Sequence, residues 1–242
     1  MEYLMLVRVD PQGESDEPAD GSVTPIEEWV EEGDRRGIRI VGERLRPPQD
    51  AQLVKRRGGE TLVTDGPFTE TREWIAGFDL LRGDRDEVVE YVSRHPMATG
   101  GRIELRELWP FEDGPAAGEV VGLAVRDRGP FTFVQLVCDT ADAEPWDARA
   151  DEEFSAWFAE QERDRYVATG ARLRPIGEAT LIRRRGGKLL VTDGPYAETR
   201  EFVSGFDLLS CESMQQAVVY ATHHPMSRIG AIELRPVWPF EE

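Results

Sequence analysis

The chain of 242 residues contains one module twice. A nine-residue segment that starts at Asp65, DGPFTETRE, returns at Asp193 as DGPYAETRE, 128 positions later. The pair Trp29 and Trp157 keeps this spacing, as do the GFDLL segments at 77–81 and 205–209. A repeat this long is the duplication of a whole domain, because the units of a solenoid are only about 20 to 50 residues long.

The repeat predicts two domains, 1–113 and 131–242, joined by a linker over 114–130. The apolar middle of this linker favours an extra strand over a free tether. Each copy is long enough to bury a core without disulfides or metals. Cys138 and Cys211 do not occupy equivalent positions, so neither a disulfide framework nor a cysteine metal site is indicated.

The composition indicates a cytoplasmic protein with no direct nucleic-acid or membrane partner. The formal net charge of −18 repels phosphate backbones and anionic membranes. The N-terminal apolar stretch, Met1–Val7, is too short for a signal peptide or a membrane span. We interpret the excess acid as an aid to solubility.

The pattern of each copy predicts an α+β fold. In copy one, strands are expected at 3–9, 53–57, 61–64, 75–81 and 102–109, and helices at 25–36 and 84–94. Thr24 and Glu27 fit a capping box at the first helix. In copy two this helix is expected from about Asp151 to Thr169, with Gly170 as its C-terminal stop.

The resulting order, β-α-β-β-β-α-β, predicts a ferredoxin-like module with an added hairpin. Two such modules can cover each other's open sheet faces. We therefore expect the dimeric α/β-barrel type of arrangement, formed within one chain as an intramolecular pseudo-dimer that is a monomer or assembles further as a homodimer.

The DGP segments, the GFDLL segments and the His-Pro pairs resemble the DGPF group of YCII-related domains, over nearly the whole chain outside 114–130. The resemblance implies the dimeric α/β-barrel fold. Members of the YCII type are suspected enzymes with a His and Asp pair, and relatives include a dehydrochlorinase acting on a chlorinated hydroquinone. DGPF members often accompany extracytoplasmic-function sigma factors. The YCII histidine lies in the first helix, where neither copy of this chain has one.

The repeated motif supplies the candidate site residues. Asp65 and Asp193 each close a strand before a turn, where they either form an Asx turn or act as desolvated catalytic carboxylates. In the second case, four residues of the motif are expected to bind the ligand at the mouth of the cleft: Glu70, Arg72, Glu198 and Arg200.

His95 and His224 each precede a proline at a helix end. They are either imidazolium groups that interact with the last carbonyls of the helix, which we favour, or catalytic bases. The basic runs 55–57 and 183–185 are either solvated hairpin tips or the lining of an anion groove. Trp109 and Trp238 are expected to lock the two halves together. No metal site or cofactor is predicted.

The leading hypothesis is a protein that binds a small molecule in the cleft between the modules and performs cofactor-free proton transfer or elimination. The alternative is a non-enzymatic accessory protein linked to a sigma factor. The first hypothesis predicts a closed apolar pocket with a desolvated carboxylate, and the second predicts an exposed apolar patch.

Overall fold

The computed structural model describes residues 1–9, 24–66, 74–109, 131–140, 143–164, 166–194 and 202–238. The elements of copy one are β1 (Glu2–Val9), α1 (Ile26–Arg36), β2 (Arg39–Leu45), η1 (Pro48–Asp50), β3 (Gln52–Arg57), β4 (Glu60–Asp65), β5 (Trp74–Arg82), α2 (Arg85–Ser93), α3 (Met97–Gly100) and β6 (Arg102–Trp109). Those of copy two are β7 (Phe133–Asp139), α5 (Ala148–Asp164), β8 (Val167–Leu173), η2 (Ile176–Glu178), β9 (Thr180–Arg185), β10 (Lys188–Asp193), β11 (Phe202–Leu209), α6 (Met214–His223), α7 (Met226–Ile229) and β12 (Ala231–Trp238).

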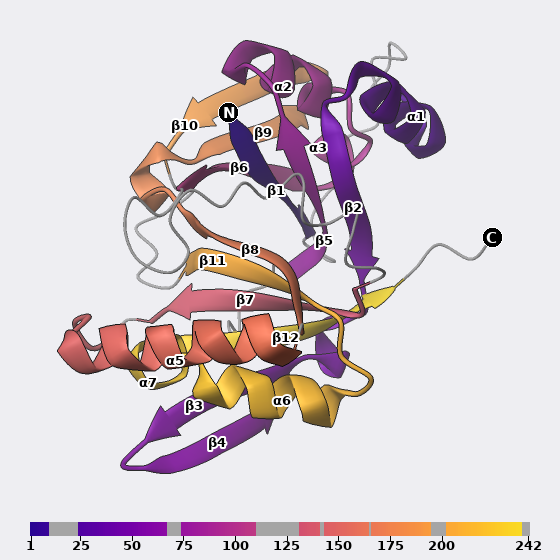
Figure 1. Ribbon diagram of the computed structural model, residues 1–242. Coiled ribbons are helices and arrows are strands. Elements are labelled where there is room, and N and C mark those ends of the chain that lie inside the picture. The colour runs from indigo at the N-terminus through magenta and orange to yellow at the C-terminus, as the bar shows by residue number, and fades with distance from the viewer. Residues whose placement is uncertain are drawn as a thin grey trace.

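The two copies together form a closed, antiparallel barrel (Figure 1). Its strands follow the order β1-β5-β2-β12-β7-β11-β8-β6, and β6 pairs back with β1. Each copy contributes four of these strands, and the copies meet at two short junctions. Leu45 and Arg44 of β2 pair with Val237 and Trp238 of β12, while β6 pairs with β8 through Leu108–Leu173 and Trp109–Arg172.

The tryptophans at these junctions hold the seam, as the sequence predicted. The guanidinium of Arg172 lies 5.0 Å from the ring centroid of Trp109. The guanidinium of Arg44 lies 5.3 Å from the ring of Trp238. Each cation–π contact joins an arginine of one copy to a tryptophan of the other.

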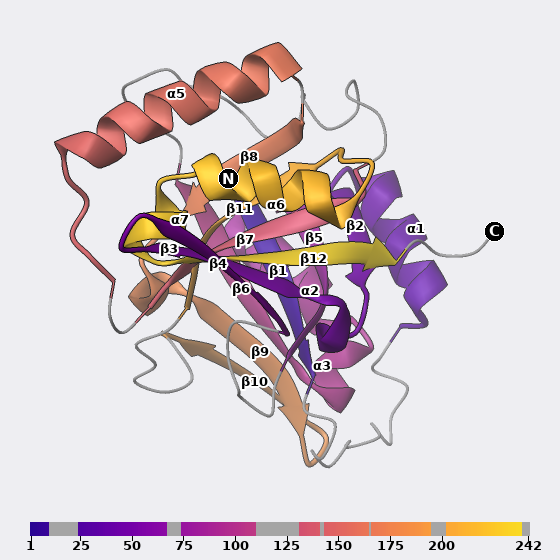
Figure 2. The ribbon, with the colours of Figure 1, turned by 90° about the horizontal axis from the view of Figure 1, so that it is seen from below.

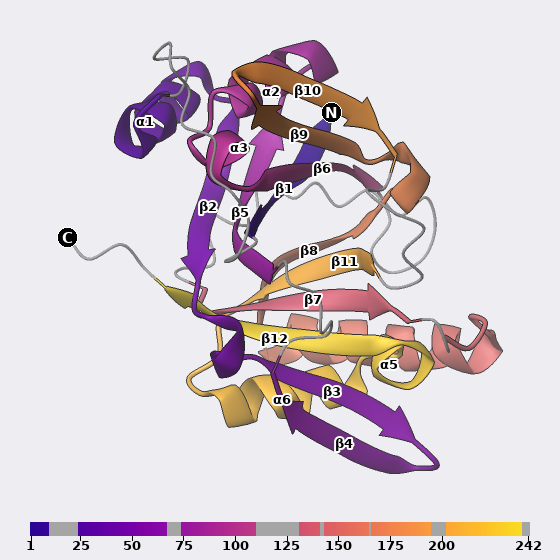
Figure 3. The same cartoon turned by 180° about the vertical axis from the view of Figure 1, so that it is seen from behind.

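Each copy also lends its hairpin to the other copy's sheet (Figure 3). The β3–β4 hairpin of copy one pairs with β12 of copy two, with Val54 opposite Ile232. The β9–β10 hairpin of copy two pairs with β6 of copy one, with Ile182 opposite Ile103. Val54 and Ile182 are both 0% exposed, because each completes the core beneath the helices of the other copy.

Three apolar cores follow from the alternation of the strands. One core draws alternate residues from both copies, such as Leu4 and Leu6 of β1 and Val134 and Leu136 of β7. The other two lie beneath the helices, one for each copy. Among the described residues, no helix has the length and apolar character needed to cross a membrane.

The α+β architecture is as predicted, but three local predictions were wrong. The segments now seen as β2 and β8 were not recognised as strands. Gly170 does not end a helix, because α5 ends at Asp164 and Gly170 lies within β8. Thr24 does not cap α1, whose N-cap residue is Pro25 without a side-chain hydrogen bond. The linker 114–130 lies outside the described residues.

Buried arginines join the copies at both seams. Arg106 of β6 is 1% exposed and pairs with Glu104 at 3.1 Å. Its guanidinium also donates to the carbonyl oxygens of Val203 at 2.9 Å and Arg174 at 2.6 Å, both in copy two. Arg235 repeats the arrangement, pairing with Glu233 and donating to the carbonyl of Arg46 in copy one.

We expect Arg106→Leu to lower the free energy of unfolding by about 3 kcal/mol, because it leaves the buried Glu104 without this cation and strips two carbonyls of their donor. Urea denaturation measures the loss. Arg82→Ala is the control, since Arg82 pairs with Glu2 at the surface and such pairs contribute less than about 1 kcal/mol. Equal losses for the two variants would contradict the prediction.

Candidate functional site

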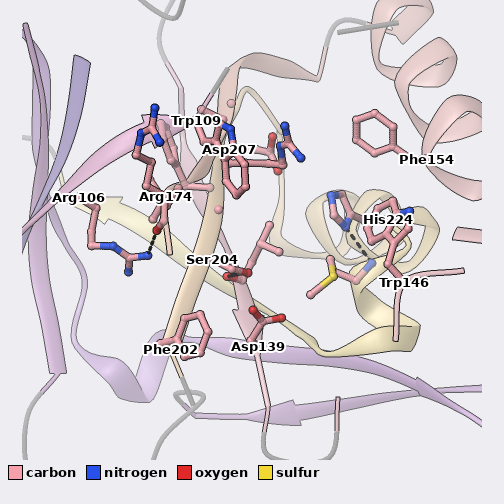
Figure 4. Close-up of a pocket in the computed structure, with 18 of the residues that line it drawn as sticks. Arg106, Trp109, Asp139, Trp146, Phe154, Arg174, Phe202, Ser204, Asp207 and His224 are labelled. Carbon is pink, nitrogen blue, oxygen red and sulfur yellow. Dashed lines mark hydrogen bonds between the residues drawn. The ribbon is translucent and has the colours of Figure 1, made fainter. Parts of the chain in front are cut away.

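A cavity of about 600 Å³ lies in copy two (Figure 4). It lies between the sheet and α5, which runs beside β8 (Figure 2). Residues from β7, α5, β8, β11 and α7 line it, together with the end of β6 from copy one. Its wall is mainly apolar and includes these aromatic side chains: Trp109, Trp146, Phe154, Trp157, Phe158, Phe202 and Phe206. Its polar lining includes Asp139, Ser204, Asp207 and His224.

Asp207 is the buried carboxyl group of this cavity. It lies on β11, inside the second GFDLL segment, and its Oδ2 accepts a hydrogen bond of 2.7 Å from Gln135 Nε2. Burial raises the pKa of Asp207 to about 7, against the opposing effect of the Gln135 hydrogen bond. The group therefore exchanges its proton near neutral pH, as an acid–base catalyst requires.

Gly170 of β8 makes room for Asp207. The two residues are paired across the β8–β11 ladder. A Cβ atom at Gly170 would lie 2.0 Å from Asp207 Oδ1 and 2.9 Å from the carbonyl oxygen of Phe206. Only glycine fits this position, so its presence reflects the close approach of a carboxyl group rather than the end of a helix.

His224 also lines the cavity, but in its neutral form (Figure 4). Its Nδ1 accepts a hydrogen bond of 3.1 Å from the backbone N–H of Met226, which places the imidazole proton on Nε2. Burial lowers the pKa of His224 to about 3, with a further contribution from Arg56. His95 has the same arrangement with Met97 in copy one, and burial lowers its pKa to about 3. The favoured imidazolium interpretation was therefore wrong.

The two copies treat the same aromatic pair differently. In copy one, Trp29 and Tyr91 are stacked at 4.3 Å and bonded reciprocally: Trp29 Nε1 donates to the Tyr91 carbonyl and the Tyr91 hydroxyl donates to the Trp29 carbonyl. In copy two, Trp157 and Tyr220 are 5.2 Å apart and tilted. Trp157 Nε1 and the Tyr220 hydroxyl are buried and have no hydrogen-bond partner among the described residues.

Copy one closes the equivalent space with side chains of its own. Arg39 Nε donates to Asp79 Oδ1 at 2.7 Å, and Arg39 Nη2 donates to the Gly42 carbonyl at 2.7 Å. Burial raises the pKa of Asp79 to about 6, with Arg39 opposing the rise. Position 167 in copy two, which corresponds to Arg39, is valine.

The first helices of the two copies differ in sequence where they cover their sheets. A Cβ atom at Gly33 of α1 would lie 2.0 Å from the Tyr91 hydroxyl, so α1 packs in a way that only glycine permits. The corresponding position of α5 is Gln161. Phe154 and Phe158, in place of Ile26 and Val30, enlarge the aromatic wall.

The structure separates the predicted site residues. His224 lies in the cavity, whereas Asp65 and Asp193 are exposed at the ends of β4 and β10 and do not line it. The side chain of Asp193 is 78% exposed and pairs with Arg85 at 2.6 Å, and Asp65 accepts from Gln52 at 3.2 Å. The expected desolvation of these carboxylates is therefore not seen. Glu70, Arg72, Glu198 and Arg200 lie outside the described residues.

The first basic run is neither a free hairpin tip nor part of the cavity. Arg56 donates to Ser227 at 2.9 Å and pairs with Glu153 of α5 at 3.2 Å. Arg57 donates to the carbonyl of Arg228, and Arg228 itself pairs with Glu153. The hairpin of copy one thus anchors the helix that covers the cavity of copy two. Within the described ranges, no cluster of three or more His, Cys, Asp and Glu residues is suited to a metal ion.

A closed antiparallel barrel flanked by helices places this chain among the mixed α/β proteins. Residues 1–112 and 132–241 each match the YCII-related domain, and the chain belongs to this family. It is also 32% identical to an uncharacterized protein of Rhizobium meliloti (strain 1021) over 106 residues, which are 41% of this chain and 85% of that protein.

Sequence reasoning missed Asp207 and Gly170 as site residues. The repeated GFDLL segment was used to establish the duplication, although an aspartate inside an apolar strand is a signal in itself. Comparison of the copies at Arg39 and Val167 would have shown that the two aspartates lie in different surroundings.

We expect Asp207→Asn to become more stable relative to the unaltered protein as the pH rises. The pKa of Asp207 is about 7 in the folded protein, against an ordinary value of 3.8, so between these values the folded state holds a proton that the unfolded chain has released. The unaltered protein therefore loses stability between about pH 4 and pH 7, and the amide does not.

Urea denaturation at pH 5 and pH 8 tests this, and we expect the difference between the two proteins to change by at least about 1 kcal/mol. The comparison cancels the titration of the buried histidines, which both proteins contain. Asp65→Asn is the control and is expected to show no such change, because Asp65 is exposed. A difference that stays constant between the two pH values would rule out the raised pKa.

Proposed function

We propose that this protein binds a small, largely apolar molecule in the cavity of copy two and exchanges a proton with it through Asp207. One observation carries the proposal: an aromatic cavity of about 600 Å³ contains a buried carboxyl group whose pKa burial raises to about 7. Enclosed apolar pockets with a few convergent polar groups are the usual form of small-molecule sites.

The chemistry that fits these groups is proton transfer or elimination by side chains alone. Asp207 has both protonation states available near neutral pH. His224 offers an Nε2–H donor rather than a basic nitrogen, because its Nδ1 is occupied by the Met226 N–H. It therefore suits the stabilisation of an oxygen on the bound molecule, with Asp207 as the group that moves the proton.

The buried donor of Trp157, which lines the cavity, supports a site that a ligand completes. Unpartnered buried polar groups are rare in folded proteins and call for an explanation. Copy one, built from the same residues, satisfies both of its donors internally. We propose that the two copies act as an intramolecular pseudo-dimer of the DGPF type in the cytoplasm, with copy two as the working half.

The accessory role linked to a sigma factor also has an observation in its favour. Leu62 and Val63 of β4 and Leu189, Leu190 and Val191 of β10 are all between 36% and 47% exposed. Both strands lie at the outer edges of the exchanged hairpins and pair on one side only. Such edges can accept a partner strand.

A thermal-shift screen against a broad metabolite panel tests the proposed function. A ligand at 100 times its Kd adds about 2.7 kcal/mol, which we expect to raise Tm by about 5 to 10 °C. Phe154→Ala and Asp207→Asn, each compared with its own ligand-free Tm, are expected to abolish most of the shift. A subsequent turnover assay then asks whether the bound compound reacts.

The Asp65→Asn, Asp193→Asn double variant serves as the matched comparison, because both residues are exposed and lie outside the cavity. It is expected to keep the full shift. A shift lost in the double variant but kept in Asp207→Asn would move the site to the DGP turns. Silence across the panel, together with capture of a sigma factor by the unaltered protein but not by Val63→Lys or Val191→Lys, would favour the accessory role.

A further inference from the structure

We infer that the polar end of this cavity takes a nitrogen cation of the ligand, an amine, amidine or guanidine group that donates to both the Asp207 carboxylate and the Gly170 carbonyl. The inference rests on the proposed binding site and names the chemical class of its ligand. Its evidence is the arrangement that copy one builds from its own residues at the equivalent place.

Copy one contains a cation bound in this way, supplied by its own side chain. The guanidinium of Arg39 bridges two acceptors, Asp79 Oδ1 through Nε and the Gly42 carbonyl through Nη2, both at 2.7 Å. Gly42 is paired with Asp79 in the β2–β5 ladder, and a Cβ atom at Gly42 would lie 1.8 Å from Asp79 Oδ1. The carboxylate and the carbonyl are thus held side by side for one planar cation.

Copy two keeps the acceptors, and the position that corresponds to Arg39 is valine. Gly170 is paired with Asp207 as Gly42 is with Asp79, and Asp207 Oδ1 crowds the glycine in the same way. Position 167 pairs with Leu209 as Arg39 pairs with Leu81, but it is valine. Within the described part of the chain, no cation pairs with Asp207, and both Asp207 and Gly170 line the cavity.

The aromatic part of the lining also favours a cation. Asp139 lines a different part of the cavity, because it lies four residues along β7 from Gln135, the residue that pairs with Asp207. Phe154 and Trp157 lie 5.8 Å apart on the helix above, where aromatic faces attract a cation.

The arginines that line the cavity contact groups other than Asp207. Arg106 is paired with Glu104, and Arg174 with Glu107 at 3.1 Å. Arg172 lies over the Trp109 ring. Arg106 and Arg174 are thus paired with other carboxylates, whereas no cation of the described residues pairs with Asp207.

Calorimetric titration of the full chain with phenylguanidine and with phenylurea tests the inference. The two probes have nearly the same shape, but only phenylguanidine is a cation. We expect phenylguanidine to bind at least tenfold more tightly than phenylurea. Asp207→Asn is expected to remove this preference, and Asp65→Asn, whose residue is exposed outside the cavity, is expected to keep it.

Val167→Arg provides a second variant that tests the same point by restoring the residue of copy one. We expect the new guanidinium to pair with the Asp207 carboxylate, as Arg39 pairs with Asp79. The variant is then expected to stay folded, with an unchanged or higher Tm, and to bind no phenylguanidine. One of the two variants can fail to fold. Loss of phenylguanidine binding in the other variant then still supports the inference, provided that this variant has a normal far-UV circular dichroism spectrum.

Three results would overturn the inference. Equal binding of the two probes, abolished by Phe154→Ala, would leave the proposed site standing but exclude a cation as its ligand class. Binding of phenylguanidine that survives both Asp207→Asn and Val167→Arg would place the cation elsewhere. Failure of both probes, while the metabolite screen yields an uncharged ligand whose binding depends on Asp207, would assign that carboxyl group to an uncharged partner.

Discussion

Closure of the barrel is the constraint on which the rest of the molecule depends. Each copy supplies a sheet of four strands with one face beneath helices and the other face apolar and uncovered. That second face is buried only when the copies meet. Because the strand pairing at the two junctions is short, buried contacts also join the copies. Arg106 and Arg235 donate hydrogen bonds across the seams, and the exchanged hairpins place Val54 and Ile182 inside the opposite cores. Separating the copies would expose apolar surface and leave buried carbonyls without donors.

Within the closed barrel, equivalent positions of the two copies have different surroundings. The same Asp–Gly ladder pair serves two purposes, as the partner of Arg39 in copy one and as the polar end of a cavity in copy two. In copy one the arginine offsets part of the cost of burying the carboxylate. In copy two burial acts with little opposition, which is why the pKa of Asp207 lies above that of Asp79.

Much of the fold could be predicted from the sequence, because repetition and periodicity are visible in a single chain. The site was harder to predict, since its features depend on contacts between segments far apart in the sequence. Gly170 looked like a helix stop because glycine often ends helices, and only the proximity of Asp207 shows why glycine is required. The DGP aspartates drew attention because they repeat, yet a turn can demand the same residues in both copies. Asp207 repeats equally well, and its importance comes from the changes around it, at positions 135 and 167.

Fusion of the copies into one chain makes this division of roles feasible. In a symmetric homodimer, any substitution appears in both sites, so a site cannot be closed in one half and opened in the other. Here Arg39 and Gly33 act on one half only, while Gln135 acts on the other. The closed half still contributes to the open one, because its hairpin anchors α5 through Arg56 and Glu153 and its β6 supplies part of the cavity wall. Copy one therefore acts as a scaffold for the cavity of copy two.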